Sequence, residues 1–406
     1  MEFNSLSLQP SSVTNILTLR YDPSIIPNLA RKTSNDFKPS SEKPSIEFIE
    51  NTISKTIRKQ LDISSVKKIC IALSGGIDST LILTLIKKTI PDLHVDAISI
   101  KFANSIDETQ NASKIAAQLD TNHHVVYVEN YLEELPKAIS IMKFPIWGIH
   151  WYHVVKKSQS LSKHLVSGDG GDELFGGYTF RYKKFLSLID AKSTPLEKVK
   201  AYLLCHERDH VPDQEKVFGT KAKFSWSNIH KTLISYFDNT LSPIEQVFLA
   251  DYNGKLLYNF NPLNERISNH FGIQSVSPLL SEEMISYSLS IPTGSKYDKA
   301  KDDGKLALRK LLSKYNMDKF IPSEKLGFNV DPINLWQSSG KDLCQEYLTD
   351  SQAVKDGWIN KDWISKYICK DDLDVRYVNK FLGLLAFEVW YRLFITKDMS
   401  VNTTLN

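Results

Sequence analysis

The chain has 406 residues, of which 42% are hydrophobic and 24% charged, so it is long enough for two or three domains around a large core. Its 50 basic and 47 acidic side chains nearly cancel to a net charge of +3, which argues neither for nor against a nucleic-acid partner. No dense basic block is present, and we expect no such partner. No apolar run approaches the roughly 18 residues of a transmembrane helix, and the four cysteines form no CxxC pair, so we expect a cytoplasmic protein with neither a membrane span nor a zinc knuckle.

The first 44 residues are weakly patterned and rich in Ser, Pro and Asn. We expect one short strand there, over residues 15–21, and a linker over residues 33–43. The spacing of the isoleucines at positions 46, 49, 53 and 57 then predicts an amphipathic helix over about residues 45–61.

Strands and helices alternate along residues 45–190. The expected strands end at Leu73 and cover residues 95–100, 124–128 and 164–166. The expected helices begin at Ser79 and cover residues 107–119, 132–142 and 150–162. This alternation predicts an α/β fold with a doubly wound parallel sheet. Ligands of such sheets bind at the carboxyl ends of the strands, where the segment after Leu73 would lie.

The pattern becomes mainly helical beyond Tyr178. Residues 191–240 are rich in Lys, Asp and Ser, so we expect a helical surface insertion there, followed by a helical C-terminal part over residues 241–406. Helices are predicted over residues 196–204, 244–258, 282–289, 305–314 and 379–394. The chain is thus expected to divide into four parts, with boundaries at residues 44, 190 and 240.

A glycine-rich segment, Ser74-Gly75-Gly76-Ile77-Asp78-Ser79-Thr80, lies between a predicted buried strand and a predicted helix. Small residues let backbone amides approach an anion, and the helix N-terminus adds its positive end. The segment lacks the GxxxxGKS/T pattern of the ordinary Walker loop. A Gly-Gly turn that is capped by Asp or Ser and binds no ligand is the alternative.

A second glycine-rich segment runs from Leu165 to Tyr178 with the sequence LVSGDGGDELFGGY. It places three carboxylates, Asp169, Asp172 and Glu173, within five positions. Carboxylates this close repel one another unless a cation lies between them, and magnesium bridging ATP phosphates is the natural cation for oxygen ligands. The alternative is a solvated acidic loop.

Together the two segments resemble the asparagine synthetase family, specifically its synthetase domain. Residues 74–80 match the family's SGGxDS pyrophosphate loop, and residues 167–178 match its SGxGxDExFxGY segment. Residues 322–330 look like its R-x-K-x-G-F-x-V stretch, and Lys305 to Arg309 are similar to its K-x-x-L-R helix. The resemblance covers roughly residues 45–397. It implies an adenine-nucleotide α-hydrolase-like fold and an ATP-dependent, AMP-forming ligase that makes a carbon–nitrogen bond.

The resemblance also implies the parts that individual residues play. Asp78 and Asp172 would hold Mg²⁺, and Lys325 would place its ammonium against the negative charge that develops on the α-phosphate. Asp169 would be the general base, and Tyr178 would fix the geometry of the site. ATP would be bound by Leu73, Ser74, Gly75, Gly76, Asp78, Ser79, Thr80, Ile100, Ser167 and Gly168.

The implied reaction has two steps. A substrate carboxylate, expected to be that of aspartate, attacks the α-phosphorus of ATP and gives an acyl-AMP and PPi. Ammonia then attacks the acyl carbon and expels AMP, giving asparagine.

Two departures from the family pattern bear on this reaction. The family's bacterial form begins with a glutaminase domain whose nucleophile is a cysteine after the initiator Met, whereas this chain has Glu2 and only about 45 residues before the synthetase domain. We therefore expect free ammonia or a separate glutaminase subunit as the nitrogen source, and a homodimer is a further hypothesis. Three charged family positions are Gln274, Val276 and Ser281 here, which removes charge where an amino-acid substrate, or the core around it, would be held.

Two other hypotheses stay open. Related β-lactam synthetases and lasso-peptide cyclases form an amide or a ring on a different carboxylate, although the acid at Asp169 favours asparagine synthesis. The chain could instead be a non-catalytic nucleotide-binding partner of a separate glutaminase. The presence of Asp78, Asp172 and Lys325 argues against this second hypothesis.

Overall fold

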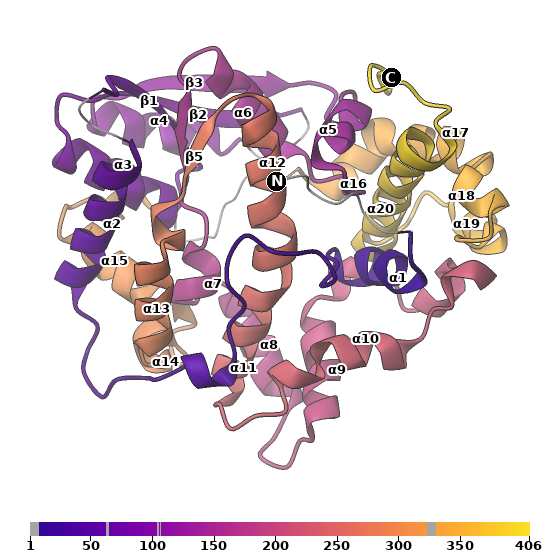
Figure 1. Cartoon of the computed structure of the whole chain (residues 1–406), viewed down its shortest axis with the longest axis horizontal. Coiled ribbons are helices and arrows are strands. Elements are labelled where there is room, and N and C mark those ends of the chain that lie inside the picture. Colours follow the sequence, from indigo (N-terminus) through magenta and orange to yellow (C-terminus); the bar gives the residue numbers. More distant parts are fainter. Residues whose placement is uncertain (1–7, 62–64, 104, 106, 323–329) are drawn as a thin grey trace.

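A parallel sheet of five strands lies in the upper part of the molecule in the view of Figure 1. The computed structural model describes residues 8–61, 65–103, 105, 107–322 and 330–406. The strands lie in the order β3-β2-β1-β4-β5, and a separate antiparallel pair is formed by β6 and β7. Their bounds are β1 (Lys68–Ala72), β2 (His94–Phe102), β3 (Asn122–Val128), β4 (His164–Val166), β5 (Gln274–Val276), β6 (Tyr297–Asp298) and β7 (Asp303–Gly304).

The sheet is covered by helices on both faces, and strand β1 shows this most directly. Ile69 and Ile71 belong to one hydrophobic cluster, whereas Cys70 and Ala72 belong to another, because successive side chains of a strand point to opposite faces. The first cluster contains apolar residues of α2 (Ile46–Leu61) and α3 (Ile77–Thr89), and the second contains those of α5 (Leu135–Met142) and α6 (His150–Gln159). The predicted doubly wound parallel sheet is therefore confirmed.

The predicted helices are present within a few residues of their expected bounds. Those predicted beside the sheet are α2 to α6, with α4 at Thr109–Gln118. Those predicted in the C-terminal half correspond to α9, α11, α13, α15 and α20. The remaining bounds are α7 (Gly171–Phe175), α8 (Thr179–Leu188), α9 (Pro195–Cys205), α10 (Trp226–Leu233), α11 (Pro243–Asp251), α12 (Asn261–His270), α13 (Glu282–Ser290), α14 (Thr293–Lys296), α15 (Leu306–Ser313), α16 (Pro332–Leu335), α17 (Lys341–Thr349), α18 (Gln352–Lys355), α19 (Lys361–Tyr367) and α20 (Val375–Tyr391).

The strand expected over residues 15–21 is wrong, because most of that segment is helical. Helix α1 runs over Pro10–Leu19 and begins with a proline in its first turn, where a missing N–H costs nothing. Val13, Ile16 and Leu17 recur at helical spacing and are buried in the same cluster as residues of α20. Figure 1 shows α1 beside α20, far from the sheet.

A long helical run forms the central column of Figure 1. It begins as α11, continues through a π-helical stretch over Tyr252–Phe260, and ends as α12. The run departs from helical geometry at Gly254, so the single helix predicted over residues 244–258 is part of a longer, interrupted one.

Residues 191–240 contribute to the core as well as to the surface. Val199, Tyr202, Ile229, Leu233 and Phe237 are buried in the cluster that also packs on one face of the sheet. The division of the chain into four parts stays a prediction.

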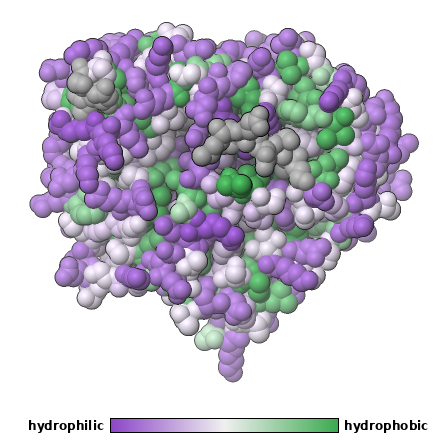
Figure 2. All heavy atoms as spheres, in the orientation of Figure 1, coloured by the Kyte–Doolittle hydropathy of each residue, from purple (hydrophilic) through white to green (hydrophobic). Residues whose placement is uncertain are grey.

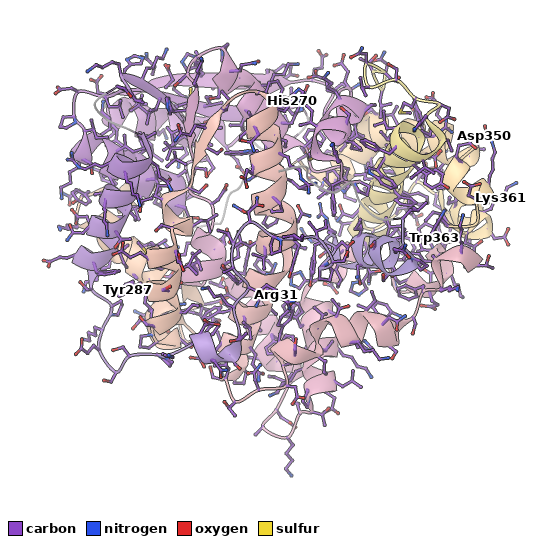
Figure 3. The ribbon with its side chains drawn as sticks, viewed as in Figure 1. Arg31, His270, Tyr287, Asp350, Lys361 and Trp363 are labelled. Carbon is purple, nitrogen blue, oxygen red and sulfur yellow. The ribbon has the colours of Figure 1, made fainter. Side chains whose placement is uncertain are left out.

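Contacts between side chains tie the outer helices to the rest of the molecule. Tyr287 of α13, labelled in Figure 3, lies with its ring centroid 4.1 Å from that of Phe48 in α2. Trp363 of α19 stacks on Tyr377 of α20 with their centroids 6.1 Å apart. The face drawn in Figure 2 is mostly hydrophilic, with hydrophobic residues scattered across it. Within the described ranges, no helix has the length and apolar character to cross a membrane.

Candidate active site

The two glycine-rich segments lie side by side because the strands that precede them are neighbours. β1 pairs in parallel with β4, with Cys70 opposite Leu165, so the turns that follow both strands leave the sheet at the same edge. A Cβ on Gly168 would lie 2.8 Å from Asp78 Cβ, and one on Gly171 would lie 2.3 Å from Asp78 Cγ. These approaches are too close for any side chain, so the second turn packs directly on the first.

The position of this edge is typical of a ligand site. The chain adds β2 and β3 on one side of β1, and β4 and β5 on the other. In sheets of this order the connections diverge beside the first strand, and ligands bind outside the carboxyl ends of the strands there. The predicted nucleotide-binding residues of both turns border this place.

The first turn is held closed by its own serines. The hydroxyls of Ser74 and Ser79 lie 3.2 Å apart, and Ser74 Oγ accepts a hydrogen bond from the N–H of Gly76 at 3.3 Å. Helix α3 begins directly after this turn, and its N-cap, Gly76, has no side chain to accept from the first N–H groups. These donors and the positive end of the helix dipole are suited to an anion.

A buried lysine links the two turns. Lys305 Nζ contacts Asp78 Oδ2 and lies 2.8 Å from Asp172 Oδ1, and the lysine side chain is only 9% exposed. Burial alone would lower the pKa of Lys305, but the two carboxylates raise it above its ordinary value. Asp78 and Asp172, the predicted magnesium ligands, are thus brought together around one ammonium group.

Lys305 was not among the site residues predicted from the sequence. It lies immediately before α15 with a φ of 57°, and its N–H donates to the carbonyl of Phe175 at 3.1 Å, which ties it to the second turn. A signal was available, because a lysine at the N-terminus of a helix is disfavoured by the helix dipole and needs carboxylate partners. The similarity of residues 305–309 to the K-x-x-L-R helix pointed to the same position.

The three carboxylates of the second turn have different partners, which relieves the repulsion expected between them. Asp172 faces Lys305, whereas Asp169 accepts a hydrogen bond from Asn264 Nδ2 at 3.2 Å. Glu173 accepts one from the hydroxyl of Tyr178 at 2.6 Å. Among the ion pairs described, Asp172 is the carboxylate of this turn that shares the Lys305 ammonium with Asp78.

Two of these carboxyl groups have perturbed acidity. Desolvation raises the pKa of Asp169 above its ordinary value, and the charge of Asp78 adds to this, although hydrogen bonds from Ser167 and Asn264 oppose it. Burial and the neighbouring Asp172 raise the pKa of Glu173 to about 7. Both groups therefore retain a proton more readily than ordinary carboxyl groups.

Tyr178 is fixed by a cation above its ring. The guanidinium carbon of Arg181 lies 4.0 Å from the centroid of the Tyr178 ring, and Arg181 Nη1 donates to Asp251 at 2.7 Å. Burial raises the pKa of Tyr178 well above its ordinary value, so its hydroxyl stays a neutral donor to Glu173. The positioning role of Tyr178 in the reaction stays a prediction.

The residues predicted to line the adenosine lie at the same end of the sheet. Leu73 is fully buried in the first hydrophobic cluster. Ile100 is 5% exposed and belongs to the second cluster, on the other face of the sheet. The N–H of Ser167 donates to the carbonyl of Val276 at 2.9 Å, which extends the pairing of β4 with β5 beyond the strands. The nucleotide contacts of these residues stay predictions.

The donor set fits magnesium of the kind that accompanies nucleotide phosphates. Such ions are commonly held by one or two carboxylates together with phosphate oxygens and water. Asp78 and Asp172 each place a carboxylate oxygen against the same ammonium nitrogen. Among the described residues, no group of three or more His, Cys, Asp or Glu side chains could hold a metal.

One predicted catalytic residue falls outside the described residues. Lys325 belongs to residues 323–329, and its part in the site stays a prediction.

The three residues that depart from the family pattern, Gln274, Val276 and Ser281, make structural contacts in this chain. Gln274 and Val276 are the ends of strand β5, and Val276 is buried in the core. The side chain of Gln274 donates to the carbonyl of Gln60 at 2.7 Å. Ser281 caps α13 by accepting from the N–H of Met284 at 3.3 Å.

Comparison with known families agrees with this geometry. The family model named asparagine synthase matches residues 49–392. The chain belongs to the asparagine synthase family. The matched range contains both glycine-rich turns and Lys305, so the resemblance drawn from the sequence motifs is confirmed.

The chain is also similar to individual asparagine synthetases. Asparagine synthetase 1 (glutamine-hydrolyzing) of Bacillus subtilis is 25% identical over 363 residues, which cover 80% of this chain and 56% of that protein. A putative glutamine-hydrolyzing asparagine synthetase of Mycobacterium tuberculosis is 25% identical over 341 residues, covering 75% and 50%. The chain thus spans about half the length of the curated relatives it matches. The solved NMN synthetase of Francisella tularensis aligns with a TM-score of 0.30 and 16% identity, over 52% of this chain and 94% of that one.

We expect Gly171→Ala to separate the two turns. Its methyl group would overlap the Asp78 carboxylate, so Asp78 must move away from Lys305 or the second turn must shift. Overpacking of this kind costs roughly 1–3 kcal/mol, measurable as a lower free energy of unfolding in urea. Gly294→Ala is the matched control, because no described heavy atom lies within 4 Å of its added methyl. Equal stability of the two variants would contradict the direct packing of the turns.

We expect Glu173→Gln to remove a pH dependence of stability. Because the pKa of Glu173 is raised to about 7, folding favours the protonated carboxyl, and this contribution is lost as the pH rises toward and through 7. A Gln accepts the hydrogen bond of Tyr178 without ionising. Relative to the variant, the wild type should lose roughly 2 kcal/mol between about pH 5 and about pH 8, measured by urea unfolding at each pH. Parallel stability curves for the two proteins would show that Glu173 ionises normally.

Proposed function

We propose that the protein is an ATP-dependent ligase that adenylates a carboxylate and then amidates it, with aspartate as the carboxylate, ammonia as the nitrogen donor and asparagine as the product. The observation that carries the proposal is the arrangement of Asp78, Lys305 and Asp172 at the junction of the two turns. Membership of the asparagine synthase family supports the same class of reaction.

The first turn is suited to the β- and γ-phosphates of ATP. The uncapped N–H groups of α3 and the hydroxyls of Ser74 and Ser79 are donors that can face phosphate oxygens. Asp78, Asp172 and Lys305 together carry one negative charge, so a triphosphate needs an accompanying cation. Asp78 and Asp172 would hold this Mg²⁺, which neutralises phosphate charge when bound.

In the first step, an oxygen of the substrate carboxylate bonds to the α-phosphorus as the bond from that phosphorus to the pyrophosphate oxygen breaks. Negative charge accumulates on the pyrophosphate. The ammonium of Lys305 lies beside the turn and next to both carboxylates, so it is placed to stabilise this charge. Lys325 is proposed as a second cation with the same effect.

In the second step, ammonia attacks the acyl carbon, and the bond from that carbon to the AMP oxygen breaks. The attacking nitrogen must lose a proton. Asp169 is the proposed acceptor, because desolvation raises its pKa and it is held by Asn264 beside the turn. Tyr178 acts as a positioning residue through its hydrogen bond to Glu173.

A different carboxylate is the second candidate for the substrate. Three charged family residues are replaced in this chain by Gln274, Val276 and Ser281. The first two belong to strand β5, and Ser281 caps helix α13. The adenylating centre is therefore better supported than the choice of aspartate. A separate glutaminase subunit as the ammonia source, a homodimer and a cytoplasmic location are further parts of the proposal.

The reaction is tested by release of PPi from Mg-ATP in the presence of ammonium, with candidate carboxylates added singly. We expect release with aspartate and formation of asparagine, and no release without a carboxylate. Glutamine in place of ammonium should not support product formation by this chain alone. Release with another acid but not with aspartate would select the second candidate. ATP binding without release for any acid would contradict a ligase function.

We expect Lys305→Met to abolish PPi release while ATP analogues still bind weakly. The variant leaves two close carboxylates without their cation, so its stability should fall by roughly 3 kcal/mol at neutral pH, and by less in acid, where the carboxylates are protonated. Lys310→Met, at an exposed position of the same helix, is the matched control and should keep both activity and stability. Addition of glycerol or a stabilising salt separates the two effects, because a refolded variant should still release no PPi.

A further inference from the structure

A second cavity lies away from the two turns, between α1, the loop that follows α5, and α20. Its empty space is about 410 Å³, a volume that includes open solvent at the mouth. It shares none of its lining residues with the centre formed by Asp78, Asp169, Asp172 and Lys305. Figure 1 shows α1 and α20 adjacent to each other at this place.

The walls of the cavity carry more positive charge than negative. Arg20, Arg208 and Lys380 line it together with one carboxylate, Asp209. That carboxylate already contacts the ammonium of Lys255, which lies outside the lining. Asp209 is shared between Lys255 and Arg20, so the lining keeps an excess of positive charge.

Lys380 is the most deeply placed of these cations. It is 3% exposed, and its Nζ donates to the main-chain carbonyls of Leu17 and Asp209, the second at 3.2 Å. An ammonium group has three donors, so one is left after these two bonds. Carbonyls carry no net charge, and burial lowers the pKa of Lys380 to about 7, so an anionic partner would stabilise its charged form.

Arg20 is held over an aromatic ring without a close carboxylate partner. Its guanidinium carbon lies 5.6 Å from the centroid of Trp147, and its Nη1 is 3.7 Å from Asp209, beyond hydrogen-bond distance. A planar guanidinium in this state can bind a carboxylate through two parallel hydrogen bonds. Asn379 adds a buried Oδ1 that has no hydrogen-bond partner among the described residues.

The remaining lining is apolar. Ile16, Phe144, Pro145 and Ile146 face the same space. Inorganic phosphate would leave these walls in contact with a polar ligand, whereas an organic acid would place its hydrocarbon part against them. A hydroxyl or N–H group on such an acid could donate to Asn379 Oδ1.

We propose that this cavity is a binding site for a short-chain organic carboxylate, held between Arg20 and Lys380 and separate from the adenylating centre. Three of its twelve lining residues, Ile16, Leu17 and Arg20, precede the range matched by the family model. The site is independent of the proposed function, because its occupation requires neither ATP nor magnesium.

The test is calorimetric titration of the full chain, without nucleotide, with acetate, lactate, succinate and, for comparison, inorganic phosphate. We expect at least one carboxylate to bind more tightly than phosphate. Arg20→Gln should weaken that binding by roughly tenfold or more, and Lys380→Met should do the same if it folds. Arg31→Gln is the matched control: Arg31 belongs to the same N-terminal segment, contacts the hydroxyl of Tyr236 at 3.2 Å, and does not line the cavity.

A second variant separates this site from the adenylating centre. Asp172→Asn alters the centre and should leave carboxylate binding in the cavity within a factor of about two, since no lining residue changes. Loss of binding in Asp172→Asn, equal binding in Arg20→Gln and wild type, tighter binding of phosphate, or no binding of any acid would each overturn the proposal.

Discussion

The ion pairs of Lys305 with Asp78 and Asp172 are the constraint on which the candidate active site depends. They join three segments that are far apart in the sequence: the turn after β1, the turn after β4 and the start of α15. The carboxylates are 18% and 23% exposed, so water screens their mutual repulsion only in part. The lysine therefore sets their separation, and the glycines of the second turn allow the backbone to come close enough for it to do so.

The long helical run from α11 to α12 connects this centre with the rest of the molecule. Asp251 near its start accepts from Arg181, which covers Tyr178. Asn264 in α12 donates to Asp169, and Asn259 donates to the carbonyl of Arg20 at 2.5 Å. A rise of about 1.5 Å per residue places the two asparagines only about 8 Å apart along the axis. One helical run thus orients both the general base proposed for the reaction and the arginine of the second cavity.

Local patterns in the sequence predicted the sheet, and long-range contacts determined what they missed. The apolar run before Ser74 and the alternation of strands with helices after it predicted β1 and its neighbours. The strand expected over residues 15–21 failed because a short window hid the helical spacing that begins at Val13. Lys305 was not assigned to the site, although the K-x-x-L-R similarity marked its position, because its partners Asp78 and Asp172 lie in segments far away in the sequence.

Helix α1 shows that the structural unit extends beyond the matched family range. Lys380 of α20 lies inside the range of residues 49–392, yet it donates to the carbonyl of Leu17, which lies outside it. Gln214 Nε2 donates to the same carbonyl at 3.0 Å and to Thr18 Oγ1 at 3.0 Å. Without α1, a buried ammonium and a buried amide would both lose these partners, and each unsatisfied group costs roughly 1–3 kcal/mol. The polar groups buried within the matched range therefore require a segment that precedes it, so α1 and the family fold are one cooperative unit.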